Sequence, residues 1–235
     1  MKSYKLRLKL TKEQERLAWD YAYTSRRYWN VLVDVDKRNN KGEFDAILQE
    51  RGNKTYYSEF HEREVYKLNA SDYRCLAQIL IDKEYDADNQ SWSWYYHPNQ
   101  TFIYNSLVRD VVKIRYLNKG KLNFRSVGKH TPSFNVTCCI SNNKKRPSRI
   151  YLKDSGKLQI PTLGDVSIGK TDPGIDLNGK KQVAQVSYDG KYWYLSYSYP
   201  DESTVELPDY TDGVGVDLGI KSLATVSDGT VVPNI

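Results

Sequence analysis

The hydrophobic pattern of this 235-residue chain changes its period twice, and that change restricts the folds it can adopt. Residues 3–10 alternate apolar with basic side chains, as a strand with one apolar and one basic face does. From Thr11 to Gly120 the apolar residues recur at helical spacing, and after Gly120 the period returns to two. The pattern therefore predicts an α+β fold in which a helical insert interrupts an antiparallel sheet.

Local signals place the helices of the insert. A capping box opened by Thr11 predicts a helix that ends near Asp36. Residues 58–68 and 71–85 are also expected to be helical. The most regular helical pattern covers residues 99–117, where one apolar stripe carries Ile103, Leu107, Val111 and Ile114.

After Gly120, turn residues separate the expected strands. Residues 149–168 and 181–199 are typical of strand pairs, and Asp189-Gly190 predicts a tight hairpin in the second. The acidic segment that follows contains two prolines and is expected to be a linker. Residues 213–229 then predict a final hairpin with one carboxylate, Asp217, near the end of its first strand.

Basic residues concentrate between Arg109 and Lys157, where 13 Lys and Arg stand against only Asp110 and Asp154, a net +11 in a chain of net +6. A block this basic attracts a polyanion. Aromatic and amide side chains lie among the charges, which favours nucleic acid as the partner. The alternative is a solvated surface that only aids solubility.

The sequence does not indicate a membrane or secreted protein. No apolar run approaches the ~18 residues of a membrane span, and the alternating N-terminus is not typical of a signal peptide. The three cysteines lack metal-ligand spacing, so zinc is not expected in residues 1–235. Adjacent Cys138 and Cys139 do not suggest a secreted disulfide framework. We expect a cytoplasmic protein with no membrane partner.

Five segments carry recognisable motifs in a fixed order: a basic strand, T-x-E-Q and a helix in 1–33; a helix, basic loop and Ser-Phe strand in 99–136; and the later segments 156–170, 188–199 and 213–229. The ordered set resembles the TnpB (OrfB) family of transposon-encoded RNA-guided nucleases, ancestral to the type V CRISPR effectors. In that resemblance the last segment, "GVGVDLGIKSLATVSDG", is similar to the first RuvC motif.

The resemblance implies an architecture and a mechanism. Residues 1–10 and 121–207 would form a wedge-like antiparallel β-barrel, residues 11–120 a helical recognition insert and 208–212 a linker. Residues 213–235 would begin a ribonuclease-H-like (RuvC) domain. The protein would hold a guide RNA, read a short motif beside the double-stranded target DNA, and leave the remaining sequence to base pairing.

Asp217 is the catalytic and metal-binding candidate that the resemblance implies. A RuvC site holds two Mg²⁺ ions, and one carboxylate cannot hold them because Mg²⁺ needs several oxygen ligands. The later acids of the family's site are missing here, so we expect these residues to be the N-terminal part of a longer nuclease. The alternatives are a truncated, nuclease-inactive RNA-guided DNA-binding protein or repressor and, more remotely, an actin-like ATPase fragment.

Gln100 and Tyr104 are expected to read the flanking motif. They lie one helical turn apart, away from the Ile103 stripe, and an amide and a phenol can both contact base edges. Tyr56 and Asn135 match family positions on the same surface. The alternative is that these are ordinary cap and surface residues. The expected phosphate contacts are Arg109, Lys113, Lys119, Lys121, Arg125, Lys129, Lys144, Lys145, Arg146 and Arg149.

Overall fold

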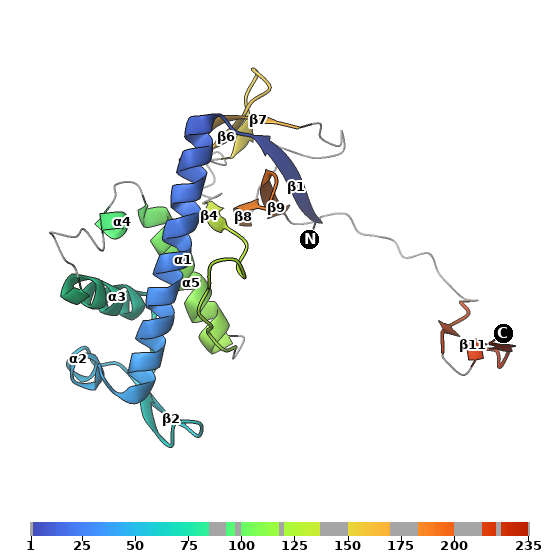
Figure 1. The fold of residues 1–235 in the computed structure, drawn as a ribbon. Helices are drawn as coiled ribbons and strands as arrows, with labels where there is room; N and C mark the ends of the chain where they lie inside the picture. Colours follow the sequence, from blue (N-terminus) through green and yellow to red (C-terminus); the bar gives the residue numbers. More distant parts are fainter. Residues whose placement is uncertain are drawn as a thin grey trace. The chain divides into compact units, whose positions relative to one another are not determined.

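The computed structural model describes residues 2–84, 93–96, 100–117, 120–136, 150–169, 183–199, 213–219 and 222–234. The chain divides into two compact units, Met1–Pro200 and Asp201–Ile235. The first unit combines helices with an antiparallel sheet, which confirms the predicted α+β class (Figure 1). No described helix is both long and apolar enough to cross a membrane.

The sheet of the first unit has seven strands in the order β4-β8-β9-β1-β7-β6-β5. Neighbouring strands are antiparallel throughout. Among the described strands, β4 and β5 lie at opposite ends of this order and do not pair with each other, so a closed barrel stays a prediction. The strands are β1 (Lys2–Lys9), β4 (Ser133–Val136), β5 (Tyr151–Leu152), β6 (Leu158–Ile160), β7 (Gly164–Ile168), β8 (Val183–Tyr188) and β9 (Trp193–Tyr199).

Strand β1 lies inside the sheet, between β9 and β7. Leu6 and Leu8 are buried opposite Leu195 and Trp193 of β9, whereas the alternating basic side chains of β1 are exposed. This arrangement confirms the strand with one apolar and one basic face. The predicted Asp189-Gly190 turn joins β8 to β9, with Gly190 at a φ of 103° that suits glycine.

The longest helix, α1 (Lys12–Lys41), carries much of the core of the first unit. Thr11 and Gln14 form the predicted capping box. The helix runs past Asp36, where we expected it to end, and stops at Gly42 in the left-handed conformation. Asn39 explains the extension, because its buried amide donates a hydrogen bond to the carbonyl of Tyr66 at 2.8 Å.

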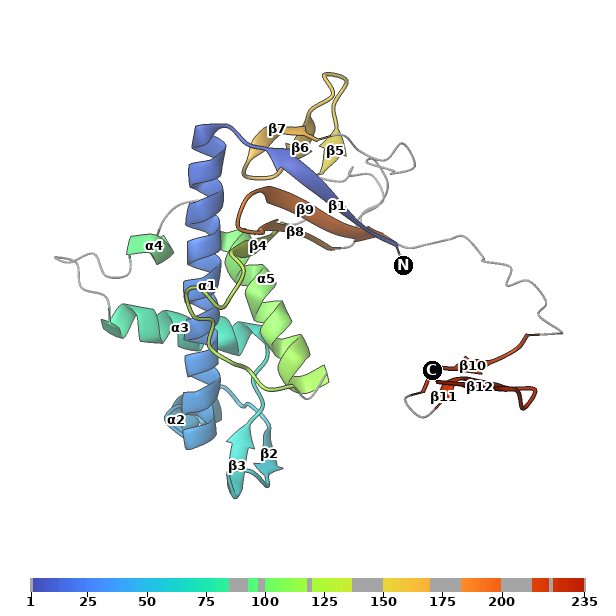
Figure 2. The ribbon, with the colours of Figure 1, turned by 45° about the vertical axis from the view of Figure 1, so that its right-hand side comes forward.

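Other helices pack beside α1. Helix α3 (Ala70–Glu84) and helix α5 (Thr101–Val112) both lie against it (Figures 1 and 2). The short helices α2 (Asp45–Glu50) and α4 (Ser93–Tyr96) also belong to the insert. Helix α5 buries the predicted stripe at Ile103, Leu107 and Val111, then continues as a π-helix, η1 (Lys113–Leu117).

Residues 58–68 are not helical as we expected. They contribute to an antiparallel hairpin of β2 (Thr55–Ser58) and β3 (Arg63–Tyr66), in which Tyr56 lies opposite a buried Val65. The charged residues between 59 and 64 suit a helix, but the aromatic and β-branched residues on either side of them, 55–57 and 65–66, favour strands. Pairing of the two ends has overridden the helical preference of the middle.

The second unit contains a small antiparallel sheet in the order β10-β11-β12. Its strands are β10 (Val216–Asp217), β11 (Ser222–Val226) and β12 (Val231–Pro233). The first two strands form the predicted hairpin, and β12 adds a strand that we did not expect.

Candidate nucleic-acid interface

Residues 120–132 run back along α1 towards β4 without forming a helix or strand (Figures 1 and 2). Two residues of α1 hold this segment. The indole Nε1 of Trp29 donates to the carbonyl of Asn123 at 2.8 Å. Asn30 donates to the carbonyl of Arg125 at 3.1 Å and accepts from its N–H at 2.7 Å. The basic segment is therefore fixed to one face of the helix.

Arg125 is central to this contact. Its guanidinium carbon lies 3.8 Å from the centroid of the Trp29 ring, close enough for a cation–π interaction. Burial lowers the pKa of Arg125 to about 10, while the nearby Asp110 acts in the opposite direction. The side chain stays cationic at neutral pH, because that pKa is well above 7. Arg125 thus carries a partly desolvated positive charge.

Further cations line the same face. Lys37 of α1 lies 4.0 Å from the ring centroid of the exposed Phe124. In the described parts of the chain, Lys37, Lys121 and Lys129 are exposed and form no ion pair. We call this surface the α1 strip; it comprises Trp19, Tyr23, Arg26, Arg27, Lys37, Lys121, Phe124, Arg125, Lys129 and His130.

Aromatic side chains lie between the charges of the α1 strip. Trp19, Tyr23 and Phe124 are 40%, 44% and 51% exposed. Proteins that bind single-stranded nucleic acid combine a cationic groove with exposed rings on which bases stack. The α1 strip likewise combines cationic side chains with exposed rings. Its assembly from segments about a hundred residues apart is why the sequence did not reveal it.

Gln100 and Tyr104 are placed differently from our expectation. Both side chains are buried, and Tyr104 packs against the rings of Tyr28 and Tyr95 at centroid distances of 4.5 and 4.9 Å. Burial also raises the pKa of the Tyr104 hydroxyl. The prediction that these two side chains lie on an exposed face is wrong, because α1 and α4 cover the side of α5 that faces away from the apolar stripe.

Asn135 and Tyr56 are half-buried and hydrogen-bonded inside the first unit. The Asn135 amide on β4 donates to Ser106 at 2.9 Å and to Asp110 at 2.8 Å. The Tyr56 hydroxyl accepts a long hydrogen bond of 3.5 Å from Arg115. The structure does not bring Tyr56, Gln100, Tyr104 and Asn135 together as one exposed surface.

A polar network under Tyr56 ties η1 to the core. Arg115 forms an ion pair with Asp36 at 3.3 Å, and the buried Tyr73 hydroxyl donates to the same carboxylate oxygen at 2.7 Å. The neighbouring Tyr116 hydroxyl accepts from the N–H of Leu68 at 3.0 Å, and burial raises its pKa to about 12. These groups hold one another, so the network has a structural role.

The predicted phosphate contacts fall into three sets. Lys121, Arg125 and Lys129 lie in the α1 strip. Arg109 and Lys113 are exposed at the end of α5 and the start of η1. The remaining residues lie outside the described parts of the chain: Lys119, Lys144, Lys145, Arg146 and Arg149.

A second basic and aromatic surface lies on the exposed face of β1 and β9. The Nζ of Lys5 is 4.2 Å from the centroid of the Tyr194 ring. The guanidinium carbon of Arg7 is 3.4 Å from the centroid of the Tyr192 ring. The alternating basic residues of β1 indicated this face, but the ring partners, Tyr194 of β9 and Tyr192 just before it, could not be assigned before the strand pairing was known.

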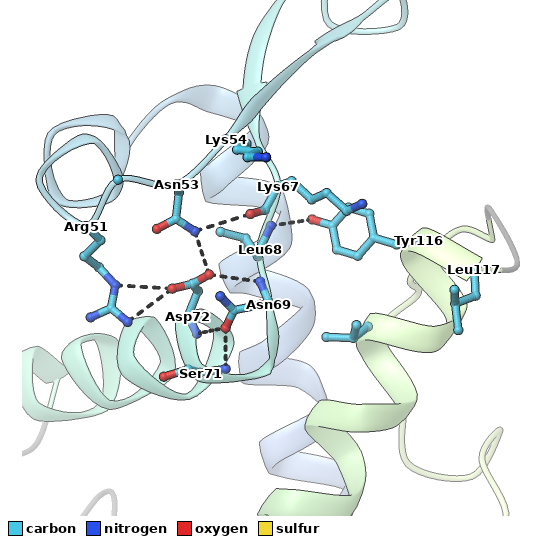
Figure 3. A pocket seen from close by; sticks show the side chains of 12 residues that line it. Arg51, Asn53, Lys54, Lys67, Leu68, Asn69, Ser71, Asp72, Tyr116 and Leu117 are labelled. Atoms are coloured by element: carbon cyan, nitrogen blue, oxygen red, sulfur yellow. Dashed lines mark hydrogen bonds and ion pairs between the residues drawn. The ribbon is translucent and has the colours of Figure 1, made fainter.

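An open cavity of about 760 Å³ lies between the start of α3 and the end of η1 (Figure 3). Its central carboxylate, Asp72, accepts from Arg51 at 3.2 Å, from Asn53 at 2.6 Å and from the N–H of Asn69 at 2.9 Å. Through these contacts the Asp72 carboxylate stabilises the turn before α3. The cavity therefore presents a stabilising cluster rather than a catalytic arrangement.

Asp217 lies exposed in β10, in register with Thr225 of β11. The described residues contain no group of three or more His, Cys, Asp or Glu that could hold a metal ion. Because Mg²⁺ requires several oxygen ligands, the described residues alone do not form the two-metal site that the resemblance implies. A scan of protein-family models and a search of curated proteins gave no match to this chain.

Proposed function

We propose that this chain is the nucleic-acid-binding part of a TnpB-type RNA-guided DNA endonuclease. Its partners in this proposal are a guide RNA and a double-stranded target DNA. The ordered motifs from residue 1 to residue 229 support the family, and the antiparallel sheet is compatible with part of a wedge-like barrel. Residues 213–235 would begin the RuvC domain, and the protein would act in the cytoplasm.

The α1 strip is the observation on which nucleic-acid binding rests. Three of its lysines are exposed and unpaired within the described residues, and Arg125 is a partly desolvated cation. Unpaired cations gain most from a phosphate backbone, because they give up no protein ion pair on binding. Exposed rings among them suit unpaired bases, which favours an RNA partner over a small anion.

Cleavage is the second step of the proposal and depends on Asp217. We propose that Asp217 supplies one ligand to a divalent-metal site whose other acids lie outside the described residues. Residues 1–235 would then bind nucleic acid without cutting it. A nuclease-inactive binder or repressor of the same descent is the alternative.

The direct test measures affinity for structured RNA as a function of salt. Fluorescence anisotropy between about 50 and 200 mM salt should show a steep, linear fall of log affinity with log salt, because phosphate neutralisation releases counterions. The RNA transcribed beside the gene is the preferred probe, and an unrelated hairpin of equal length is its control. No binding, or affinity that does not depend on salt, would refute the proposal.

A further inference from the structure

A small cavity of about 170 Å³ opens where the first half of α1 meets residues 127–132. Trp19, Tyr23 and Arg26 line it from the helix, and Gly128, His130 and Pro132 line it from the segment. Pockets that enclose drug-sized molecules occupy roughly 300–1,000 Å³, so this cavity suits one planar ring system. It lies within the α1 strip but takes no part in the phosphate contacts argued above.

The aromatic walls of this cavity are held in place. Trp19 packs on Tyr188 and Trp193, with ring centroids 4.9 and 5.2 Å apart. The Tyr23 hydroxyl accepts a hydrogen bond from Arg27, one turn along α1. Trp19 and Tyr23 are nonetheless 40% and 44% exposed, so ring surface remains for a ligand. Rings fixed before binding lose little conformational freedom when a ligand stacks on them.

His130 supplies an unused hydrogen-bonding group. Its Nε2 is buried and has no hydrogen-bonding partner among the described residues. Burial lowers the pKa of the imidazole, and the charges of Arg125 and Arg26 lower it further, so the ring is neutral at pH 7. Buried polar atoms in folded proteins are nearly always hydrogen-bonded, which makes an unpaired one a sign of an absent partner.

A nucleobase has the chemistry that these groups require. Its faces stack on tyrosine and tryptophan, its edge carries donors and acceptors for a neutral histidine, and its phosphate carries the charge that Arg26 attracts. Lys129 and Arg125 belong to the same segment as the cavity, so a strand on the α1 strip passes its mouth. We propose that this cavity receives one unpaired base of the bound RNA.

The proposal rests on the proposed function, and a designed probe separates the two. The probe is a short abasic ribose-phosphate chain that carries a single 2-aminopurine at its centre. Its controls are the wholly abasic chain, the same 2-aminopurine paired in a duplex, and free 2-aminopurine ribonucleoside monophosphate. Wild-type protein should quench the single-stranded 2-aminopurine and bind its chain at least about fivefold more tightly than the abasic chain.

Variants then assign this preference to the cavity. Tyr23→Ala and His130→Ala should lower affinity for the 2-aminopurine chain by a larger factor than affinity for the abasic chain, and so abolish the preference between the two. Tyr57→Ala and His61→Ala, on the β2–β3 hairpin, are the matched controls and should change neither. Thermal unfolding of each variant identifies any loss of affinity that misfolding causes. If His130→Ala does not fold, Tyr23→Ala alone tests the proposal.

Each of the following results would overturn the proposal. Equal loss on both chains, or no loss on either, would mean that the cavity reads no base. Free nucleotide binding as tightly as the chain would identify a small-molecule site instead. If wild-type protein failed to bind any RNA, the proposed function would fall as well. Salt-dependent RNA binding without a preference for the base would overturn only the base pocket.

Discussion

The hydroxyl of Tyr104 lies 3.0 Å from Oε1 of Gln100 and donates a hydrogen bond to it inside the first unit. The same hydroxyl is 2.9 Å from the carbonyl of Tyr95. Both residues were expected to contact DNA bases, but in this arrangement they pair with each other. Their contribution to the molecule is therefore stability.

Tyr104→Phe should lower the free energy of unfolding by about 1–3 kcal/mol, because a buried acceptor loses its donor while the ring packing stays. Urea denaturation measures this change. Tyr57→Phe is the control and should be nearly neutral, since Tyr57 is 60% exposed. Unchanged stability together with lost discrimination between flanking DNA sequences would restore the base-reading role of Tyr104.

Reversing three charges of the α1 strip should weaken RNA binding and its salt dependence together. In the triple variant Lys37→Glu, Lys121→Glu, Lys129→Glu, the slope of log affinity against log salt should fall by about 1 per lysine. The control variant Lys12→Glu, Lys54→Glu, Lys83→Glu changes the net charge equally at exposed sites elsewhere. Equal effects of the two variants would mean that only net charge matters.

The ion pair between Asp36 and Arg115 should be costly to break from one side. Arg115→Met leaves a carboxylate that is 9% exposed without its cation, and removing one partner of a buried pair costs about 3–5 kcal/mol. The exposed pair Arg16–Asp20 is the comparison, and Arg16→Met should cost less than about 1 kcal/mol. Guanidinium denaturation measures the free energy of unfolding of both variants. Similar losses in the two would mean that the Asp36–Arg115 pair is no more buried than the Arg16–Asp20 pair.

His130 should make stability depend on pH. Its pKa in the folded protein lies below the ordinary 6.5, so the unfolded chain binds the proton more readily. Stability from the neutral ring is complete above pH 6.5 and is lost as the pH falls below it. Between pH 8 and 5 the free energy of unfolding should therefore fall more in wild-type protein than in His130→Gln. Parallel curves would show that His130 does not titrate differently on folding.

Residues 1–235 should bind RNA but show no Mg²⁺-dependent cleavage of target DNA, because one exposed carboxylate cannot fix two cations. Asp217→Ala should leave RNA affinity unchanged in this chain. In a longer chain that supplies the remaining acids, the same substitution should abolish cutting. Cleavage by residues 1–235 themselves would place the active site elsewhere.

Sequence patterns predicted the elements whose signals are local. The capping box at Thr11, the apolar stripe of α5 and the Asp189-Gly190 turn each depend on residues within a few positions of one another. The end of α1 was predicted incorrectly because Asn39 is typical of a loop when read alone. Its hydrogen bond to Tyr66, 27 residues away, keeps it in the helix.

The candidate interface was predicted only in part, and for a similar reason. Lys121, Arg125 and Lys129 were found from charge, which needs no knowledge of the fold. Their neighbours from α1 became visible only when the contacts of Asn30 and Trp29 placed the two segments together. Gln100 and Tyr104 were instead predicted to be accessible, but they are buried. The apolar stripe of α5 reveals one buried face, and it cannot show that other elements also cover a second face.

The central position of β1 also determines when this protein can fold. Strand β1 leaves the ribosome before β7 and β9, the two strands with which it pairs, and β9 ends at Tyr199. Synthesis proceeds at roughly 5–20 residues per second, so Leu6 and Leu8 wait about ten seconds or more for their partner strand. During that interval the residues of α1 lack the sheet against which they pack in the folded protein. The nascent chain therefore carries an uncovered apolar surface until nearly all of the first unit has been made.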